Sequence, residues 1–186
     1  MDTVVKSVVL DYAIMRQGHF LLRSGMHSPY YLELEALVQD PEITAAVCRP
    51  LTERFRSQSP QVVLAAAGID AIFGYELARQ LGVRTLVAEG EPGRRAIRPG
   101  FRLERGERVL IVMGVIVTGD SARELMRLIS ARGATTVGVA VLADRSSVQL
   151  QLDAPLQALA VIDLDAYHAP MCPLCAEGIP LERRLD

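Results

Sequence analysis

The chain has 186 residues, half of them hydrophobic, which fits one domain with a sizeable core. Its formal net charge of −2 gives no electrostatic reason to expect a nucleic-acid partner, and three cysteines, an odd number, do not indicate a disulfide framework. The sequence shows no targeting segment and no apolar run long enough to span a membrane, so we expect a cytoplasmic protein without membrane association.

The first part of the chain predicts two helices around an irregular region. Apolar spacing predicts a helix over about residues 3–16. Residues 18–37 mix glycine, a Ser-Pro turn and aromatic residues between short extended runs, which predicts an irregular or hairpin subregion beside the main sheet. Asp40, Pro41 and Glu42 then predict a helix start, with a cap, a proline at the first helical position and an acid in the first turn. That helix should end near Ser57.

From residue 62 onward, apolar strands alternate with amphipathic helices. We predict strands at 62–67, 83–88, 109–113, 136–143 and 159–164, helices at 71–81 and 121–132, and a long charged loop at 89–106. This alternation is typical of an α/β protein with a mainly parallel, five-stranded sheet flanked by helices. Ligands of such sheets bind beyond the carboxyl ends of the strands, where residues 65–70, 115–121 and 144–147 should share one rim.

The turn at residues 117–121 is a candidate phosphate site. It carries a glycine and two hydroxyls at the start of a helix, where backbone N–H groups and the helix dipole favour an anion. The alternative is structural: Ser121 forms a capping box with Glu124, Gly119 makes the turn, and Gly133 provides a left-handed C-terminal cap. The turn alone does not decide between the two.

Six segments resemble the orotate phosphoribosyltransferase family. They are GHFLLRSGMHSPYY, FGYELARQLGV, RPGFRLERGERVLIV, VTGDSARE, VGVAVLADRS and CPLCAEGIPL, and they follow the family's order in a match that spans nearly the whole chain. The resemblance implies a single type I phosphoribosyltransferase domain over residues 1–186, with a small hood formed by about residues 1–40 and the C-terminal tail. It also implies a homodimer and a glycosyltransferase reaction of pyrimidine biosynthesis, in which orotate and phosphoribosyl diphosphate give orotidine 5′-monophosphate and diphosphate with Mg²⁺.

The resemblance also assigns binding roles. The 5′-phosphate loop corresponds to Val117, Thr118, Gly119, Asp120 and Ser121. Arg145 matches the arginine that contacts the orotate carboxylate, a role suited to a planar bidentate donor, although its alternative is a solvated loop arginine. The segment that closes over the base corresponds to Arg23, Ser24, Tyr30 and Tyr31, and the two tyrosines are alternatively core or dimer contacts.

Three parts of the site depart from the family pattern. The acidic pair after the central strand is replaced by Met113 and Gly114, so we assign no catalytic residue. The diphosphate loop, normally rich in glycine, reads Ala66, Ala67 and Gly68. The mobile loop holds no lysine, and Arg94 or Arg95 is its candidate substitute.

Asp70 would place a carboxylate near the position of the diphosphate, and its alternative role is to cap the helix at 71–81. Elsewhere, Cys172, Cys175 and the nearby His168 make an incomplete ligand set for zinc, so we expect no metal site there. His19 and His27 are interpreted as structural residues.

These observations leave competing hypotheses. The first is a relative that binds a ribose 5′-phosphate, as a nucleotide or phosphoribosyl diphosphate, with reduced or lost catalysis and no cofactor. The alternative is an active orotate phosphoribosyltransferase that requires Mg²⁺. The persistence of Thr118, Gly119, Ser121 and Arg145 argues against a third hypothesis, a structural protein without a ligand.

Overall fold

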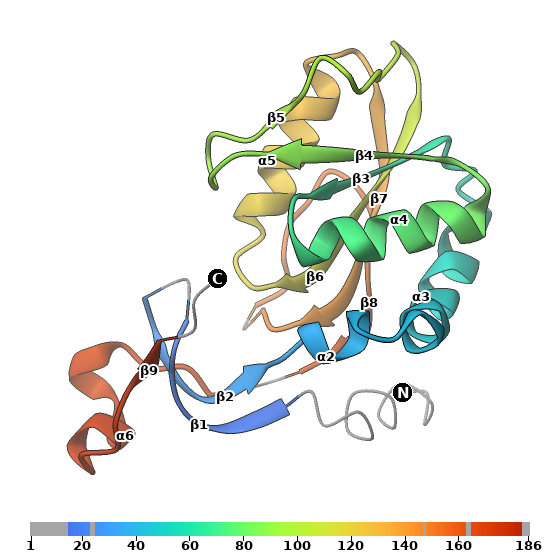
Figure 1. The fold of residues 1–186 in the computed structure, drawn as a ribbon. Coiled ribbons are helices and arrows are strands. Elements are labelled where there is room, and N and C mark those ends of the chain that lie inside the picture. Colours follow the sequence, from blue (N-terminus) through green and yellow to red (C-terminus); the bar gives the residue numbers. More distant parts are fainter. Residues whose placement is uncertain (1–14, 23–24, 147, 163–164, 184–186) are drawn as a thin grey trace. The chain divides into compact units, whose positions relative to one another are not determined.

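The computed structural model describes residues 15–22, 25–146, 148–162 and 165–183 (Figure 1). The chain divides into two compact units, residues 38–162 and residues 1–37 with 163–186. A short helix, α2 (Glu35–Val38), lies at the boundary in the sequence. None of the helices in the described residues has the length and hydropathy needed to cross a bilayer.

The larger unit is built on a six-stranded sheet with the order β5-β4-β3-β6-β7-β8. Five strands run parallel: β3 (Val62–Ala66), β4 (Arg84–Glu89), β6 (Arg108–Ile116), β7 (Thr135–Asp144) and β8 (Leu156–Val161). The predicted α/β class and mainly parallel sheet are therefore confirmed. The sixth strand, β5 (Ala96–Ile97), pairs antiparallel with β4 inside the segment predicted as a loop.

Three helices cover the sheet: α3 (Pro41–Arg56), α4 (Ile69–Leu81) and α5 (Asp120–Ser130). Strand alternation divides the buried side chains between its two faces. Leu64 and Ile111 join a core cluster with Leu125 of α5, whereas Ala65 lies against Gly74 of α4 on the other face. Each buried leucine or isoleucine in these layers contributes about 1.5–3 kcal/mol by leaving water.

Local sequence signals set the ends of α3 and α4. Asp40 caps α3, since its Oδ1 accepts from the backbone N–H groups of Glu42 at 2.8 Å and Ile43 at 3.3 Å, as predicted. Helix α4 ends at Gly82, which adopts a left-handed conformation with φ of 73°. It begins at Ile69, two residues earlier than expected, and its N-cap is Gly68.

The smaller unit is a three-stranded sheet with the order β2-β1-β9. Strands β1 (Met15–Leu21) and β2 (His27–Leu32) form the predicted antiparallel hairpin, and β9 (Glu182–Arg183) pairs parallel with β1. A short 3-10 helix, η1 (Ala169–Met171), and α6 (Pro173–Ala176) precede β9.

The predicted first helix is wrong at its end, and its residues 3–14 lie outside the described residues. Met15 and Arg16 begin β1 because they pair with Leu32 and Tyr31 across the hairpin, a long-range contact that overrides local helical spacing. The predicted strand at 159–164 is instead β8, which starts at Leu156 opposite Val139 of β7.

Candidate functional site at the strand ends

The carboxyl ends of β3, β6 and β7 lie side by side in the larger unit. Ala65 pairs with Val112, and Ile116 pairs with Asp144, so the segments that follow these strands start from one rim. Two hydrogen bonds join them: the backbone N–H of Arg145 donates to the Ile116 carbonyl at 2.9 Å, and that of Gly114 donates to Asp70 Oδ1 at 2.7 Å. Hydrogen bonds thus connect β6 to the segments after β3 and β7 along this rim.

The turn at residues 117–121 leads into α5 through Gly119, which adopts φ of 80°. Val117, Thr118 and Asp120 are exposed, and Thr118 Oγ1 donates to Asp120 Oδ2 at 2.7 Å. The predicted capping box is wrong, because the N-cap is Gly119 and no side chain caps the helix. Backbone N–H groups in the first turn of a helix have no intrahelical acceptor, so this exposed turn retains the donors and the dipole that favour a phosphate.

Two arginines flank this turn. Arg123 Nη1 donates to the Thr118 carbonyl at 2.9 Å and to Asp120 Oδ1 at 3.2 Å, and Arg95 Nη1 donates to Ser121 Oγ at 3.3 Å. Sequence reasoning overlooked Arg123, although its spacing of three residues from Asp120 on a helix is a local signal for such a pair. Each guanidinium group is paired with a carboxylate, Arg123 with Asp120 and Arg95 with Glu124, so these pairs add little net charge at the turn.

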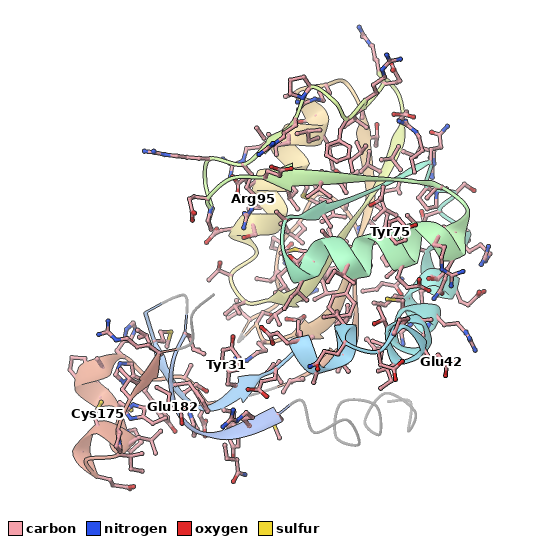
Figure 2. All side chains as sticks on the ribbon, viewed as in Figure 1. Tyr31, Glu42, Tyr75, Arg95, Cys175 and Glu182 are labelled. Carbon is pink, nitrogen blue, oxygen red and sulfur yellow. The ribbon has the colours of Figure 1, made fainter. Side chains whose placement is uncertain are left out.

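Arg95, labelled in Figure 2, forms an ion pair with Glu124 of α5. Glu124 Oε1 accepts from the Arg95 backbone N–H at 2.9 Å and Oε2 from its guanidinium at 2.6 Å, and only 9% and 12% of the Arg95 and Glu124 side chains are exposed. Burial raises the pKa of Glu124, but hydrogen bonds from the backbone of Arg95 and Gly93 and from the Arg95 side chain outweigh it, so the net pKa is lowered. Arg94, the other candidate in this segment, is exposed.

The segment after β3 differs from the predicted helix cap. Gly68, at φ of 90° and ψ of −144°, occupies a conformation that is essentially restricted to glycine. Ala66 is buried at the end of β3, and the Ala67 backbone N–H donates to the Ala88 carbonyl at 2.9 Å. The expected role of Asp70 as N-cap is wrong: the residue lies inside the first turn of α4, and its carboxylate accepts from Gly114 instead.

Met113 and Gly114, the residues that the family resemblance aligns with an acidic pair, lie within β6. Met113 is buried in the core cluster beneath α5, so its thioether is part of the packing. Gly114 is also buried, and its backbone N–H binds Asp70. The carboxylate of Asp70, in the first turn of α4, therefore lies beside Gly114.

Arg145 follows β7 on the same rim and is partly buried. Burial lowers the pKa of its guanidinium, because desolvation penalises the charged form. Its loop is fixed by Asp144, whose Oδ1 accepts from the Ser146 backbone N–H at 2.8 Å and from Ser146 Oγ at 2.6 Å. A bound carboxylate would compensate the desolvated charge of Arg145.

The other predicted base-binding residues belong to the smaller unit. Arg23 and Ser24 lie outside the described residues. Tyr30 and Tyr31 are in β2, opposite Gln17 and Arg16, and the Tyr31 ring (Figure 2) packs against Phe20 with centroids 5.6 Å apart. Tyr31 thus contributes to packing within this unit.

Comparisons with known proteins identify the family. No family model matches the chain. The chain is 40% identical over 171 residues to an orotate phosphoribosyltransferase of Caldicellulosiruptor saccharolyticus, an alignment that spans 92% of this chain and 90% of that protein. The chain belongs to the orotate phosphoribosyltransferase family. A Thermus thermophilus orotate phosphoribosyltransferase is 40% identical over 167 residues, 89% of this chain and 91% of the relative.

Solved structures show the same fold for this family member. The orotate phosphoribosyltransferase of Aeropyrum pernix superimposes with a TM-score of 0.71 at 21% identity, covering 86% of this chain and 94% of that one. The adenine phosphoribosyltransferase of Rhodothermus marinus gives 0.71 at 19% identity, covering 87% and 100%. The type I phosphoribosyltransferase fold is therefore confirmed.

Proposed function

We propose that this family member is an active orotate phosphoribosyltransferase of pyrimidine nucleotide synthesis, which binds phosphoribosyl diphosphate and orotidine 5′-monophosphate. The proposal rests on one arrangement: the turn at residues 117–121 and Arg145 follow adjacent parallel strands on one rim. Curated relatives at about 40% identity that carry this enzyme name support the choice of reaction.

The turn and Arg145 would hold the two ends of the product. The ribose 5′-phosphate would accept hydrogen bonds from the first turn of α5 and from the Ser121 hydroxyl. The Thr118 hydroxyl would exchange its hydrogen bond to Asp120 for one to the phosphate. The orotate carboxylate would pair with the Arg145 guanidinium, which is already partly desolvated. Because both groups start from neighbouring strands, they can orient one substrate against the other.

Asp70 would take over part of the role of the missing acidic pair. In the transfer, the bond from the anomeric carbon to diphosphate breaks with its electron pair on diphosphate. The orotate ring nitrogen supplies the pair for the new bond, and its N–H proton passes to the released diphosphate. Positive charge on the ribose in the transition state is stabilised by a fixed carboxylate. Asp70, whose Oδ1 is 2.7 Å from the backbone nitrogen of Gly114, would supply that negative charge from the first turn of α4.

Mg²⁺ is the metal that the family reaction requires, and when bound it would neutralise charge on the leaving diphosphate. Asp70 fits such an ion because Mg²⁺ in phosphate sites prefers one or two carboxylates together with substrate oxygens. Exposed Arg94 would contact diphosphate.

We also expect this protein to form the homodimer that the family resemblance implies. Sedimentation velocity tests this by measuring the mass of the particle in solution.

A second candidate function is a phosphate-binding relative with reduced or lost catalysis. The observation that favours it is Met113, whose buried thioether offers no charge to a ribose hydroxyl or to the transition state. Ala66 and Ala67 in the diphosphate loop also favour the second candidate, because their side chains limit how closely the backbone can approach a ligand.

Orotate consumption with phosphoribosyl diphosphate, with and without Mg²⁺, separates the two candidates when binding of orotidine 5′-monophosphate is measured on the same samples. Asp70→Asn preserves an acceptor for Gly114 and removes only the charge, so we expect a loss of about 10²–10³ in turnover. Arg145→Ala should weaken orotate use strongly. Asp153→Asn, at an exposed carboxylate in the same unit, is the control and should be unchanged.

Magnesium-dependent turnover that is lost in Asp70→Asn and retained in Asp153→Asn supports the enzyme. Nucleotide binding without turnover, weakened by Thr118→Ala, supports the second candidate, and Gly114→Asp should then increase turnover. Neither binding nor turnover in the folded protein would refute both candidates.

A further inference from the structure

Four side chains of types that commonly bind metals meet in the smaller unit. The cluster comprises His19 and His27 of the β1–β2 hairpin and Cys172 and Cys175 around α6. One donor atom from each residue lies within 4.8 Å of all the others. His19, His27 and Cys172 are buried, whereas Cys175 is exposed.

Four of the six separations between donor atoms are close to the edges of a tetrahedral metal site. His19 Nε2 lies 3.0 Å from His27 Nδ1 and 3.5 Å from Cys172 Sγ. Cys175 Sγ lies 3.7 Å from His19 Nε2 and 3.3 Å from His27 Nδ1. Zinc bonds of about 2.3 Å to sulfur and about 2.0–2.1 Å to nitrogen correspond to tetrahedral edges of about 3.3–3.8 Å. The two remaining separations, from Cys172 Sγ to Cys175 Sγ and to His27 Nδ1, are no more than 4.8 Å, so the four atoms can share one ion after movements of at most about 1 Å.

A hydrogen bond to the Ile179 carbonyl orients the His19 ring so that Nε2 can bind a metal. Its Nδ1 lies 2.7 Å from the carbonyl oxygen of Ile179. Because a carbonyl only accepts, Nδ1 carries the proton and the lone pair of Nε2 faces the other three donors. Histidine ligands of metals usually donate their second N–H in this way, which fixes both tautomer and ring orientation.

Backbone pairing brings the two halves of the cluster together from distant parts of the sequence. The backbone groups of His27 and Tyr167 exchange two hydrogen bonds of 2.8 Å, and Ser28 Oγ donates to the Asp165 carbonyl at 2.7 Å. Cys172 is the N-cap of α6, and Cys175 follows three residues later on this short helix. The spacing Cys-x-x-Cys is the usual one for a thiolate pair in structural zinc sites.

We propose that His19, His27, Cys172 and Cys175 bind one Zn²⁺ ion, a structural Cys2His2 site that links the N-terminal hairpin to the C-terminal segment. Four protein ligands complete a tetrahedron, so the site keeps no open position for a substrate or water. Two sulfur and two imidazole ligands favour zinc over magnesium or calcium, which prefer oxygen. This inference revises the sequence-based expectation of no metal, which paired the cysteines with His168, a residue outside the cluster.

The test is the metal content of the full-length protein, purified without chelator and measured by plasma mass spectrometry. We expect about one zinc ion per chain in the unaltered protein and less than about a tenth of that in Cys172→Ser/Cys175→Ser and in His27→Ala. His168→Ala is the matched control, since this exposed neighbour lies outside the cluster and its loss should leave zinc content unchanged.

Cobalt substitution keeps the proposal testable if a variant folds poorly. After removal of bound metal from the unaltered protein, added Co²⁺ should give the visible bands of tetrahedral cobalt with thiolate ligands, and Zn²⁺ should bleach them. Failure of the folded protein to take up either metal would overturn the proposal. So would unchanged zinc content in the double cysteine variant, or a Cys172–Cys175 disulfide in protein that retains its zinc.

Discussion

The ion pair between Arg95 and Glu124 provides a quantitative test of how the β4–β5 hairpin is held to α5. Glu124→Gln preserves the shape of the side chain and an acceptor for the Arg95 backbone N–H, but it removes the negative charge opposite the guanidinium. About one tenth of each side chain is exposed, so the guanidinium stays largely desolvated in the variant. Charged hydrogen bonds contribute about 1.5–3 kcal/mol, and breaking a fully buried pair costs about 3–5 kcal/mol. We therefore expect Glu124→Gln to lower the free energy of unfolding by about 2–3 kcal/mol.

Urea denaturation at pH 7 measures this loss, with Glu53→Gln as the matched control. Glu53 pairs with Arg56 at 3.3 Å, but 62% and 54% of the Glu53 and Arg56 side chains are exposed. Exposed pairs contribute little, so the control should show no measurable loss. Equal stability of the two variants would refute the idea that burial makes the Arg95–Glu124 pair important.

The same pair predicts a pH dependence with a definite sign. In the folded protein the pKa of the Glu124 carboxyl lies below its ordinary value of 4.5. The carboxyl of the unfolded chain therefore binds a proton more readily than that of the folded protein. The contribution to stability is complete above pH 4.5 and is lost as the pH falls through the lowered pKa. The difference between the unaltered protein and Glu124→Gln should therefore shrink in that acidic range, and a constant difference would contradict the assignment.

Two further predictions concern packing in the larger unit. A Cβ added at Gly138 would overlap Cε1 of the buried Phe55, so Gly138→Ala should lower the free energy of unfolding by about 1–3 kcal/mol in urea denaturation. The loss should be smaller in a Phe55→Leu background, and an equal loss in both backgrounds would exclude this clash. Burial raises the pKa of Cys48 to about 12, so Cys48 should resist alkylation at neutral pH until the protein unfolds, as peptide mass spectrometry can follow; rapid alkylation of the native protein would contradict its burial.

Features governed by neighbouring residues were predicted well from the sequence. The start of α3 follows from Asp40, Pro41 and Glu42, whose cap and first-turn signals lie within three consecutive positions. Long apolar runs likewise predicted β6 and β7, because strands covered on both faces need continuous hydrophobic sequence.

Features that depend on distant partners were missed or wrong. Strand β5 has two residues and exists through its pairing with β4, so its own sequence carries no strand signal. Glu124 was assigned to a capping box because its partner Arg95, 29 residues away, is not visible in local spacing. The same limit applies to the histidine and cysteine cluster, in which His19 and Cys172 are 153 residues apart.

The candidate site combines both situations. The rim follows from the alternation of strands and helices, which places residues 117–121 beside Arg145. The contact between Asp70 and Gly114 spans 44 residues and depends on how α4 sits against β6. Its importance for turnover stays a prediction, as do the roles of Met113 and the diphosphate loop.

The division of the chain into two units implies an order of events during synthesis on the ribosome. The larger unit, residues 38–162, is continuous in sequence, so its sheet can assemble once that stretch has emerged. In the smaller unit, the three-stranded sheet is complete only after residues 182–183 have been synthesised, because these residues form β9, which pairs with β1. The N-terminal hairpin is thus translated first among the described elements but is finished last, and premature termination before β9 would leave the edge of β1 open to pairing with other chains.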